Sequence, residues 1–194
     1  MPNVVEQYGL KPVRQLNGSP FINAQNRYRI AANNTTAIFQ GDLVQPLGSG
    51  NITRSIANDG NVTVGVFNGC FYTDPTTQKP TFKNFYPGNI NASDIIALVI
   101  DGPDTVFEIK ADATFVVADL FRNYSVTNVT GSTQTGISKV TLDVSESGTV
   151  GTFVVQAIDI TQDPFNSDVN VSSNVGVLVR INNHFFRQGG TGIA

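Results

Sequence analysis

Residues 95–110, IIALVIDGPDTVFEIK, carry the strongest structural pattern in this chain of 194 residues. The first six form an apolar run that is too short for a typical helix and rich in β-branched side chains, which suits a strand buried on both faces. Residues 101–104, DGPD, supply the conformations of a tight turn, on which we expect the two strands to fold as a hairpin. Apolar and polar residues then alternate, which predicts a second strand with one buried and one solvated face. The predicted buried face carries Phe107 and Ile109, and the predicted solvated face carries Val106, Glu108 and Lys110.

The rest of the chain repeats short apolar or alternating segments between turn-forming residues. Turn signals such as residues 58–61 (NDGN) and 68–69 (NG) recur about every 8–12 residues, a spacing typical of β-sandwiches and barrels. Residues 112–123, DATFVVADLFRN, are the best helix candidate, with Asp112 placed to cap a helix of at most two or three turns. We therefore predict an all-β protein, an antiparallel barrel or sandwich with an extended N-terminal arm and at most one short helix.

Composition narrows the class of protein. Charged residues make up only 14% of the chain, so its surface must be covered largely by Asn, Thr, Ser and Gln, which favour turns and strands. The net charge of −3 and the pI near 5.0 give no basis for nucleic-acid binding. The sequence has neither an apolar run of membrane length nor a signal-peptide pattern in residues 1–20, so no membrane partner is expected. The lone Cys70 excludes an internal disulfide and is expected to be a buried, inert thiol.

Residues 1–30 differ from the rest because Pro and Gly interrupt them and their apolar residues are widely spaced. We expect an extended N-terminal arm that orders on a neighbouring surface, then a single β domain (31–187) and a flexible C-terminal tail (188–194). A disordered tail is the alternative for the arm. If the arm lies outside the core, deletion of residues 2–20 should leave the β domain folded. The candidate contact residues of the arm are Val4, Val5, Tyr8, Leu10, Val13, Leu16 and Phe21.

A long loop, residues 73–94, contains three prolines and, with the residue before it, the only aromatic-rich loop of the chain. Loops of this length tend to be functional or to cover a neighbour. We expect its aromatic side chains to pack between subunits, with ligand binding as the alternative. The candidate contact residues here are Tyr72, Phe82, Phe85 and Tyr86.

Few residues suggest catalysis. His184 is the only histidine and no nucleophile motif accompanies it, so a local or intersubunit hydrogen bond explains it better than a catalytic triad. A Ca²⁺ site could draw on Asp159, Asp163, Asn166 and Asp168, but their spacing is not that of an EF-hand, and turn capping explains the same residues. Only three Glu occur, so a glycosidase-type acid pair would have to form from separate loops. We therefore expect no enzyme, no cofactor and no metal site.

Five segments together resemble a known group of proteins. They are residues 41–44 (GDLV), 65–72 (GVFNGCFY), 95–112 (IIALVIDGPDTVFEIKAD), 137–144 (ISKVTLDV) and 177–184 (VLVRINNH). The chain is similar over most of residues 28–187 to small β-rich virion proteins of tailed bacteriophages, especially those of marine and cyanobacterial hosts. The resemblance implies a non-enzymatic structural protein, typically a capsid decoration or cement protein on the outer surface of the virion. It also implies the major capsid protein as partner and a homotrimer, because cement proteins commonly occupy local threefold positions.

Two other classes of function stay open at this point. One is a carbohydrate-binding receptor module on a phage tail or a cell surface, which specific retention on a glycan array would reveal. The other is a small hydrolase whose acid pair is built from loops. A hydrolytic activity that the H184A substitution abolished would favour the hydrolase.

Overall fold

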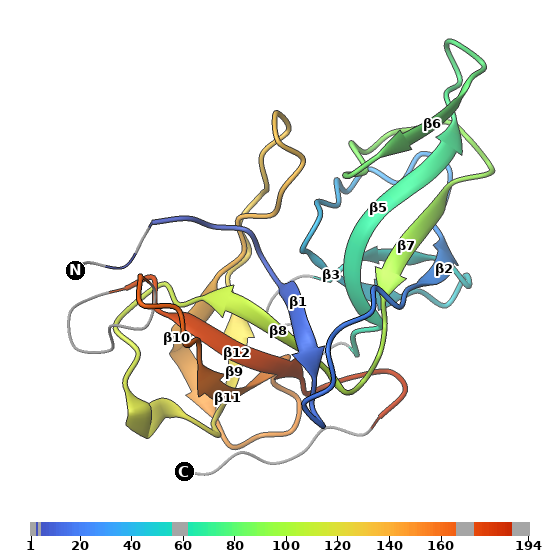
Figure 1. Cartoon of the computed structure of the whole chain (residues 1–194). Helices are drawn as coiled ribbons and strands as arrows, with labels where there is room; N and C mark the ends of the chain where they lie inside the picture. The colour runs from blue at the N-terminus through green and yellow to red at the C-terminus, as the bar shows by residue number, and fades with distance from the viewer. Residues whose placement is uncertain (1–2, 4, 56–61, 166–172, 188–194) are drawn as a thin grey trace.

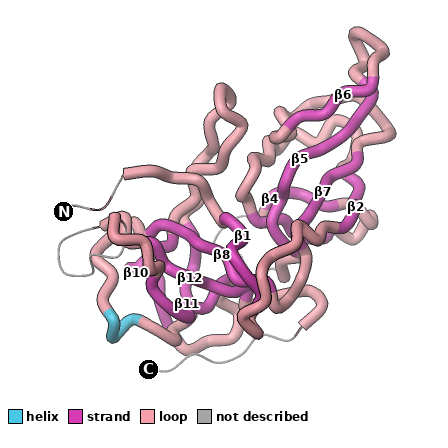
Figure 2. Tube along the Cα trace, viewed as in Figure 1, coloured by secondary structure: helices cyan, strands magenta, loops and turns pink. Residues whose placement is uncertain are grey.

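The computed structural model describes residues 3, 5–55, 62–165 and 173–187. They form two packed antiparallel sheets of six strands each (Figure 1). The all-β prediction is confirmed, and of its two architectures the structure has the sandwich. A single 3-10 turn, Val117–Asp119, is the helical element of the described part (Figure 2). None of the described residues form a helix with the length and apolar character needed to cross a membrane.

Sheet A combines the first strand of the chain with strands from its second half. Its spatial order is β1 (Lys11–Gln15), β8 (Thr105–Lys110), β12 (Gly176–Ile181), β11 (Val155–Ile160), β9 (Asn123–Val126) and β10 (Leu142–Gly148). Sheet B is built from the first half. Its spatial order is β2 (Asn26–Arg29), β7 (Ile96–Ile100), β5 (Gly65–Thr73), β3 (Leu43–Pro46) and β4 (Ile52–Arg54), and β6 (Pro80–Lys83) pairs with the second half of β5.

The two strands of residues 95–110 form as predicted, but they do not pair with each other. β7 lies between β2 and β5 in sheet B, whereas β8 lies between β1 and β12 in sheet A. The predicted turn is present, because the amide of Thr105 donates to the carbonyl oxygen of Gly102 over 3.0 Å. It carries the chain from one sheet to the other (Figure 1). The pairing implied by folding on a tight turn is wrong because each strand finds partners from distant segments on both of its edges.

The face of β8 that alternation assigned to solvent is largely covered. Val106 and Lys110 are buried, and only Glu108 keeps partial exposure. The carboxylates of Glu108, Asp163 and Glu6 all lie near the ammonium group of Lys110, yet burial lowers the pKa of this lysine. The prediction of a solvated face is wrong because residues far from β8 in the sequence cover it, and alternation within a strand contains no information about them.

Residues 112–123 do not form the predicted helix. Apart from the 3-10 turn the segment is irregular until β9 begins. Phe115 inserts into the core beside Tyr124, with ring centroids 5.9 Å apart. Asp112 accepts an amide of β10 instead of capping a helix. Tertiary packing of Phe115 has overridden a weak local preference.

Two hydrophobic clusters stabilise the fold. The larger lies between the sheets and joins side chains of β8, β11 and β12 to Leu43, Val66 and Ile100 of sheet B. The smaller covers the opposite face of sheet B and contains Phe67 and Cys70. Burial raises the pKa of the Cys70 thiol to about 12, so the prediction of a buried and inert thiol is confirmed.

The predicted N-terminal arm belongs to the β domain from Leu10 onward. β1 pairs with β8 at the edge of sheet A, and β2 pairs with β7 at the edge of sheet B. Leu10 is buried in the larger cluster, and Phe21 packs against that cluster. The structure therefore predicts, contrary to the sequence pattern, that deletion of residues 2–20 destabilises the domain. Val4 and the predicted C-terminal tail, residues 188–194, lie outside the described residues.

The carboxylate of Asp42 ties the segments that lead into the two sheets. It is fully buried and accepts hydrogen bonds from the amide of Phe39 over 2.8 Å and the hydroxyl of Ser138 over 2.6 Å. Arg54 Nε lies 3.2 Å from it, and Arg54 Nη2 donates to the carbonyl oxygen of Val129 over 2.6 Å. Burial raises the pKa of Asp42, and the charge of Arg54 and the two hydrogen bonds oppose that rise.

Truncation of Leu10 tests whether the first segment is part of the core. L10A should lower the free energy of unfolding by about 2–5 kcal/mol, because it leaves a cavity in the larger cluster. V5A, at a strongly exposed side chain in the same segment, should change it by less than about 0.5 kcal/mol. Urea denaturation measures both, and equal, small effects would show that residues 1–16 are a separable arm.

Removal of the cation beside Asp42 tests the buried ion pair. R54M should cost about 3–5 kcal/mol because it leaves an uncompensated carboxylate in the interior, and D42N/R54M should recover part of that loss. R122M breaks the more exposed pair of Arg122 with Asp119 and should cost less than about 1 kcal/mol. Thermal and urea unfolding provide the comparison, and an R54M loss no larger than that of R122M would contradict the assignment.

Candidate functional site

The aromatic residues predicted to pack between subunits divide into two groups. Tyr72 and Tyr86 are core residues of sheet B, and the Tyr86 hydroxyl donates to the carbonyl oxygen of Asn34 over 3.0 Å. Both are buried within the chain and are not available to a neighbour, which corrects the prediction for them. Phe85 is partly buried, and its ring stacks on that of Phe39 with a centroid separation of 5.5 Å. Phe82 is the one of the four that is strongly exposed.

Phe82 forms an exposed aromatic pair with a residue that the sequence interpretation missed. Phe71 lies directly opposite it across β5 and β6, and the ring centroids are 4.8 Å apart. Phe71 is 49% exposed and Phe82 is 52% exposed. The available signal was the alternation of β5, because Cys70 and Tyr72 point into the core and Phe71 must therefore point away from it.

The aromatic pair continues across the sheet as an apolar surface with a basic end. Phe71 lies opposite Ile96 of β7, and Ile96 lies opposite Arg29 of β2. Two residues further along β7 and β2, Leu98 lies opposite Arg27. Residues opposite each other in a sheet share a face, so these side chains form one surface. We call this surface the outer face of sheet B; it comprises Phe71, Phe82, Ile96, Leu98, Arg27 and Arg29.

A glycine bulge positions the aromatic pair. The pairing of β5 with β7 shifts register between Phe67 and Cys70, and Gly69 within the shift has a φ of +118°. A Cβ atom at Gly69 would lie 2.8 Å from the ring of Phe82. Only glycine accommodates both that backbone conformation and that close approach, so the bulge makes room for the exposed ring.

Charge is distributed unevenly over the outer face of sheet B. Arg27 and Arg29 are exposed, and neither makes an ion pair with any of the described residues. At the far end of β5, Asp94 accepts hydrogen bonds from the amide and the hydroxyl of Thr73, which hold the pKa of Asp94 below its usual range. The apolar centre of the face thus lies between a basic edge and an ionised carboxylate.

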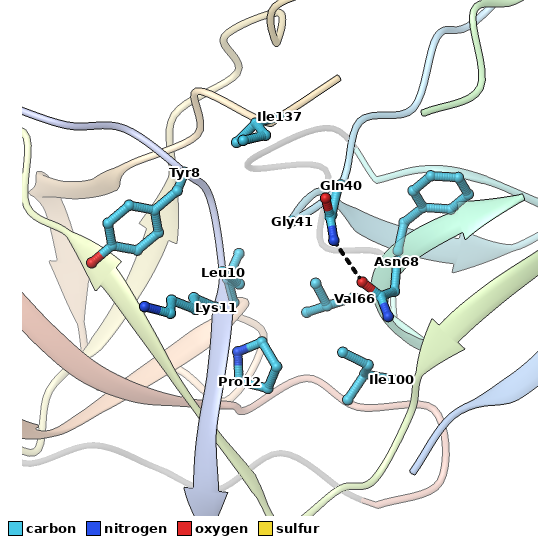
Figure 3. A pocket seen from close by; sticks show the side chains of 11 residues that line it. Tyr8, Leu10, Lys11, Pro12, Gln40, Gly41, Val66, Asn68, Ile100 and Ile137 are labelled. Carbon is cyan, nitrogen blue, oxygen red and sulfur yellow. Dashed lines mark hydrogen bonds between the residues drawn. The ribbon is translucent and has the colours of Figure 1, made fainter. Parts of the chain in front are cut away.

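A pocket of about 220 Å³ lies between the first segment of the chain and sheet B. In Figure 3, Leu10 and Pro12 face Val66 and Ile100 across the opening. Two linked amide hydrogen bonds involve lining residues of this pocket, because Gln40 donates to Asn68 over 2.8 Å and Asn68 donates to Gln25 over 2.9 Å. The remaining lining residues are Tyr8, Lys11, Gly41, Phe67 and Ile137.

The candidate contact residues of the first segment also divide by exposure. Val5, Val13 and Leu16 are exposed, whereas Tyr8 and Phe21 are half-buried. The structure places Tyr8 beside the pocket, where burial raises the pKa of its hydroxyl and the nearby carboxylate of Glu108 raises it further. Contact of these residues with another subunit stays a prediction.

The residues weighed for chemistry occupy structural positions. Asp163 accepts the amide of Phe165 over 3.0 Å, which confirms its role in a turn, and Asn166 and Asp168 lie outside the described residues. Among the described residues no group of three or more His, Cys, Asp or Glu side chains is placed to hold a metal ion. His184 is buried, and its Nδ1 accepts the amide of Phe186 over 3.1 Å, the local hydrogen bond that was predicted.

No protein-family model matches this chain, and comparisons with curated proteins and with solved structures found no match.

The buried His184 predicts a pH dependence of stability. Burial lowers the pKa of His184, and the charges of Asp101 and Asp104 oppose this only in part. The unfolded chain therefore binds a proton near pH 6.5 that the folded protein takes up only at lower pH. Stability is complete above about pH 6.5 and should fall as the pH drops below it, by at most about 1.4 kcal/mol per pH unit.

The variant H184N isolates this effect, because Asn can still accept the Phe186 amide but does not titrate. Urea denaturation between pH 7 and pH 5 should give a flatter stability profile for H184N than for the unmodified protein. Carboxylates with a lowered pKa, such as Asp94, affect the pH dependence of stability only below this range. Identical slopes in the two proteins would show that His184 is not buried in its neutral form.

Proposed function

We propose that this chain is a non-enzymatic structural protein of a tailed-bacteriophage virion. It decorates the outer surface of the capsid as a homotrimer and stabilises the shell by binding the major capsid protein. The outer face of sheet B is the docking surface. The observation that carries this proposal is the exposed pair of Phe71 and Phe82 on a rigid strand pair, and the resemblance in sequence supplies the identity of the assembly.

The energetics of the outer face suit protein docking. Burial of an exposed phenylalanine contributes roughly 1.5–3 kcal/mol, so two adjacent rings can act as the centre of an interface. Ile96 and Leu98 extend the apolar area, and both lie on a strand paired on both edges, so little ordering entropy is lost on binding. Arg27 and Arg29 at the rim favour a partner with acidic side chains, which increases specificity and the association rate.

The chemistry of the face favours a protein partner over a carbohydrate. Sugar recognition combines ring stacking with hydrogen bonds from convergent polar groups. The two tyrosines of this region, Tyr72 and Tyr86, have their side chains in the core, and the exposed rings belong to phenylalanines without a hydroxyl group. A glycan array is the direct check of the alternative receptor function, since specific retention of a sugar would favour it.

The docking surface is tested by add-back to particles. The gene for this chain is deleted from the phage that carries it, and virions of the deletion mutant are purified. Purified protein is then added to these virions. The double variant F71S/F82S should reduce the number of bound copies at a fixed concentration by about tenfold or more, because the centre of the interface is lost. Quantitative mass spectrometry of sedimented particles counts the copies.

The matched control is F165S/V150S, which removes two side chains of similar exposure outside the outer face of sheet B. It should bind as the unmodified protein does. Equal binding by F71S/F82S would overturn the docking surface. Absence of the chain from purified wild-type virions would overturn the virion assignment itself.

A further inference from the structure

Strand β2 leaves one edge of sheet B open. It pairs with β7 on one side, and no described strand pairs with its other side (Figure 1). The amide of Ile30 donates to the carbonyl oxygen of Ile95 over 3.2 Å, which fixes the alternation of hydrogen bonds along this antiparallel pair. By that alternation the amide and carbonyl groups of Arg27 and Arg29 point away from β7. No hydrogen bond within the described residues satisfies these outward groups.

Asp101 holds β2 in place from the face that packs on the smaller cluster. Its carboxylate accepts hydrogen bonds from Asn26 Nδ2 over 2.9 and 3.1 Å and from the Tyr28 hydroxyl over 2.6 Å. Burial raises the pKa of Tyr28 and the bond to Asp101 raises it further, so this hydroxyl stays a donor well above neutral pH. The open edge is therefore pre-formed, and little ordering of β2 is needed when another strand pairs with it.

Other edge strands of the two sheets are protected against such pairing. β1 and β6 contain Pro12 and Pro80, which have no amide hydrogen to donate. In β10 the amide of Val144 already donates to the carboxylate of Asp112 over 3.0 Å. β2 contains no proline and its outward amides are unused, so its edge is well suited to pair with another chain.

The side chains of β2 determine which partner the open edge accepts. Arg27 and Arg29 are exposed, share the outer face of sheet B and lie about 6.8 Å apart along the strand. Two copies paired antiparallel about Tyr28 would place Arg27 of each copy opposite Arg29 of the other, and opposed like charges destabilise a sheet. Neither arginine makes an ion pair with any of the described residues. An incoming strand with acidic side chains at alternate positions complements both charges at once.

We propose that an extended acidic segment of the major capsid protein pairs with the open edge of β2 and adds a strand to sheet B. Backbone hydrogen bonds to Arg27 and Arg29 provide affinity, and acidic side chains two residues apart provide specificity. The added strand extends the outer face of sheet B beyond its basic margin, so it enlarges the docking surface centred on Phe71 and Phe82. The source of the segment rests on the proposed function, whereas the pairing itself is a property of the purified protein.

The pairing is tested on the purified full chain with a short blocked peptide of alternating Glu and Thr. In nitrogen–proton correlation spectra, the amide signals of Arg27 and Arg29 should shift saturably with added peptide, and their hydrogen exchange should slow. A peptide N-methylated at each Glu keeps the charges but loses the backbone donors, and a peptide with Lys in place of Glu carries the opposite charge. Neither control should bind at the same concentration. Absence of shifts in β2, or equal binding of the N-methylated peptide, would overturn the proposal.

Proline at the open edge separates backbone pairing from charge. R27P and R27A remove the same guanidinium group, but only R27P also removes the outward amide hydrogen, which no bond within the sheet uses. R27P should bind the Glu peptide about fivefold or more weakly than R27A, with a similar melting temperature. R29P and R29A repeat the comparison at the second outward position. Equal binding within both pairs would show that the peptide contacts side chains alone and would overturn the added strand.

The same variants in the particle add-back separate this inference from the proposed function. R27P should occupy fewer sites on the virion than R27A does. Equal occupancy by these two variants, together with weak binding of F71S/F82S, would overturn the added strand and leave the docking face in place. Peptide pairing by a protein that does not bind virions would overturn the proposed function and the source of the segment. Self-association that R27P abolishes would show that a second copy occupies the edge and would overturn the acidic segment.

Discussion

The buried carboxylate of Asp42 is the interaction on which the fold most depends. It binds the amide of Phe39 in its own turn, the guanidinium of Arg54 in β4 and the hydroxyl of Ser138, which lies 96 residues further along the chain. The adjacent Gly41 accepts the amide of Leu10, which fixes the start of β1. A charge buried in this way is tolerated only when every partner is in place. The contacts of Asp42 therefore make the formation of each sheet depend on the formation of the other.

The chain passes from sheet B to sheet A between β7 and β8, and this change of sheet determines which apolar surface stays exposed. Because these strands enter different sheets, Ile100 is covered by the core between the sheets. Leu98 and Ile96 share its face of β7 and are only partly buried, and Phe71 of β5 and Phe82 of β6 are about half exposed. The exposed apolar face is therefore a direct result of how the two sheets overlap.

Local sequence patterns predicted the all-β class but not the contacts between distant segments, and those contacts also replaced the helix expected over residues 112–123. Alternation and turn residues predicted both strands of residues 95–110, but strand pairing depends on partners that local patterns do not specify. Widely spaced apolar residues suggested a separate arm, whereas Leu10 reaches a core made by later strands. The alternation of β5 predicts the exposure of Phe71, but the role of Asp42 depends on tertiary contacts that no local motif specifies.

Docking through the outer face of sheet B is tested most directly by cryo-electron microscopy of a purified particle that contains this chain. We predict that Phe71 and Phe82 lie against a shell protein, with Arg27 and Arg29 opposite acidic side chains of that protein. A particle in which these four side chains face solvent while another surface of the chain contacts the shell would contradict the proposal.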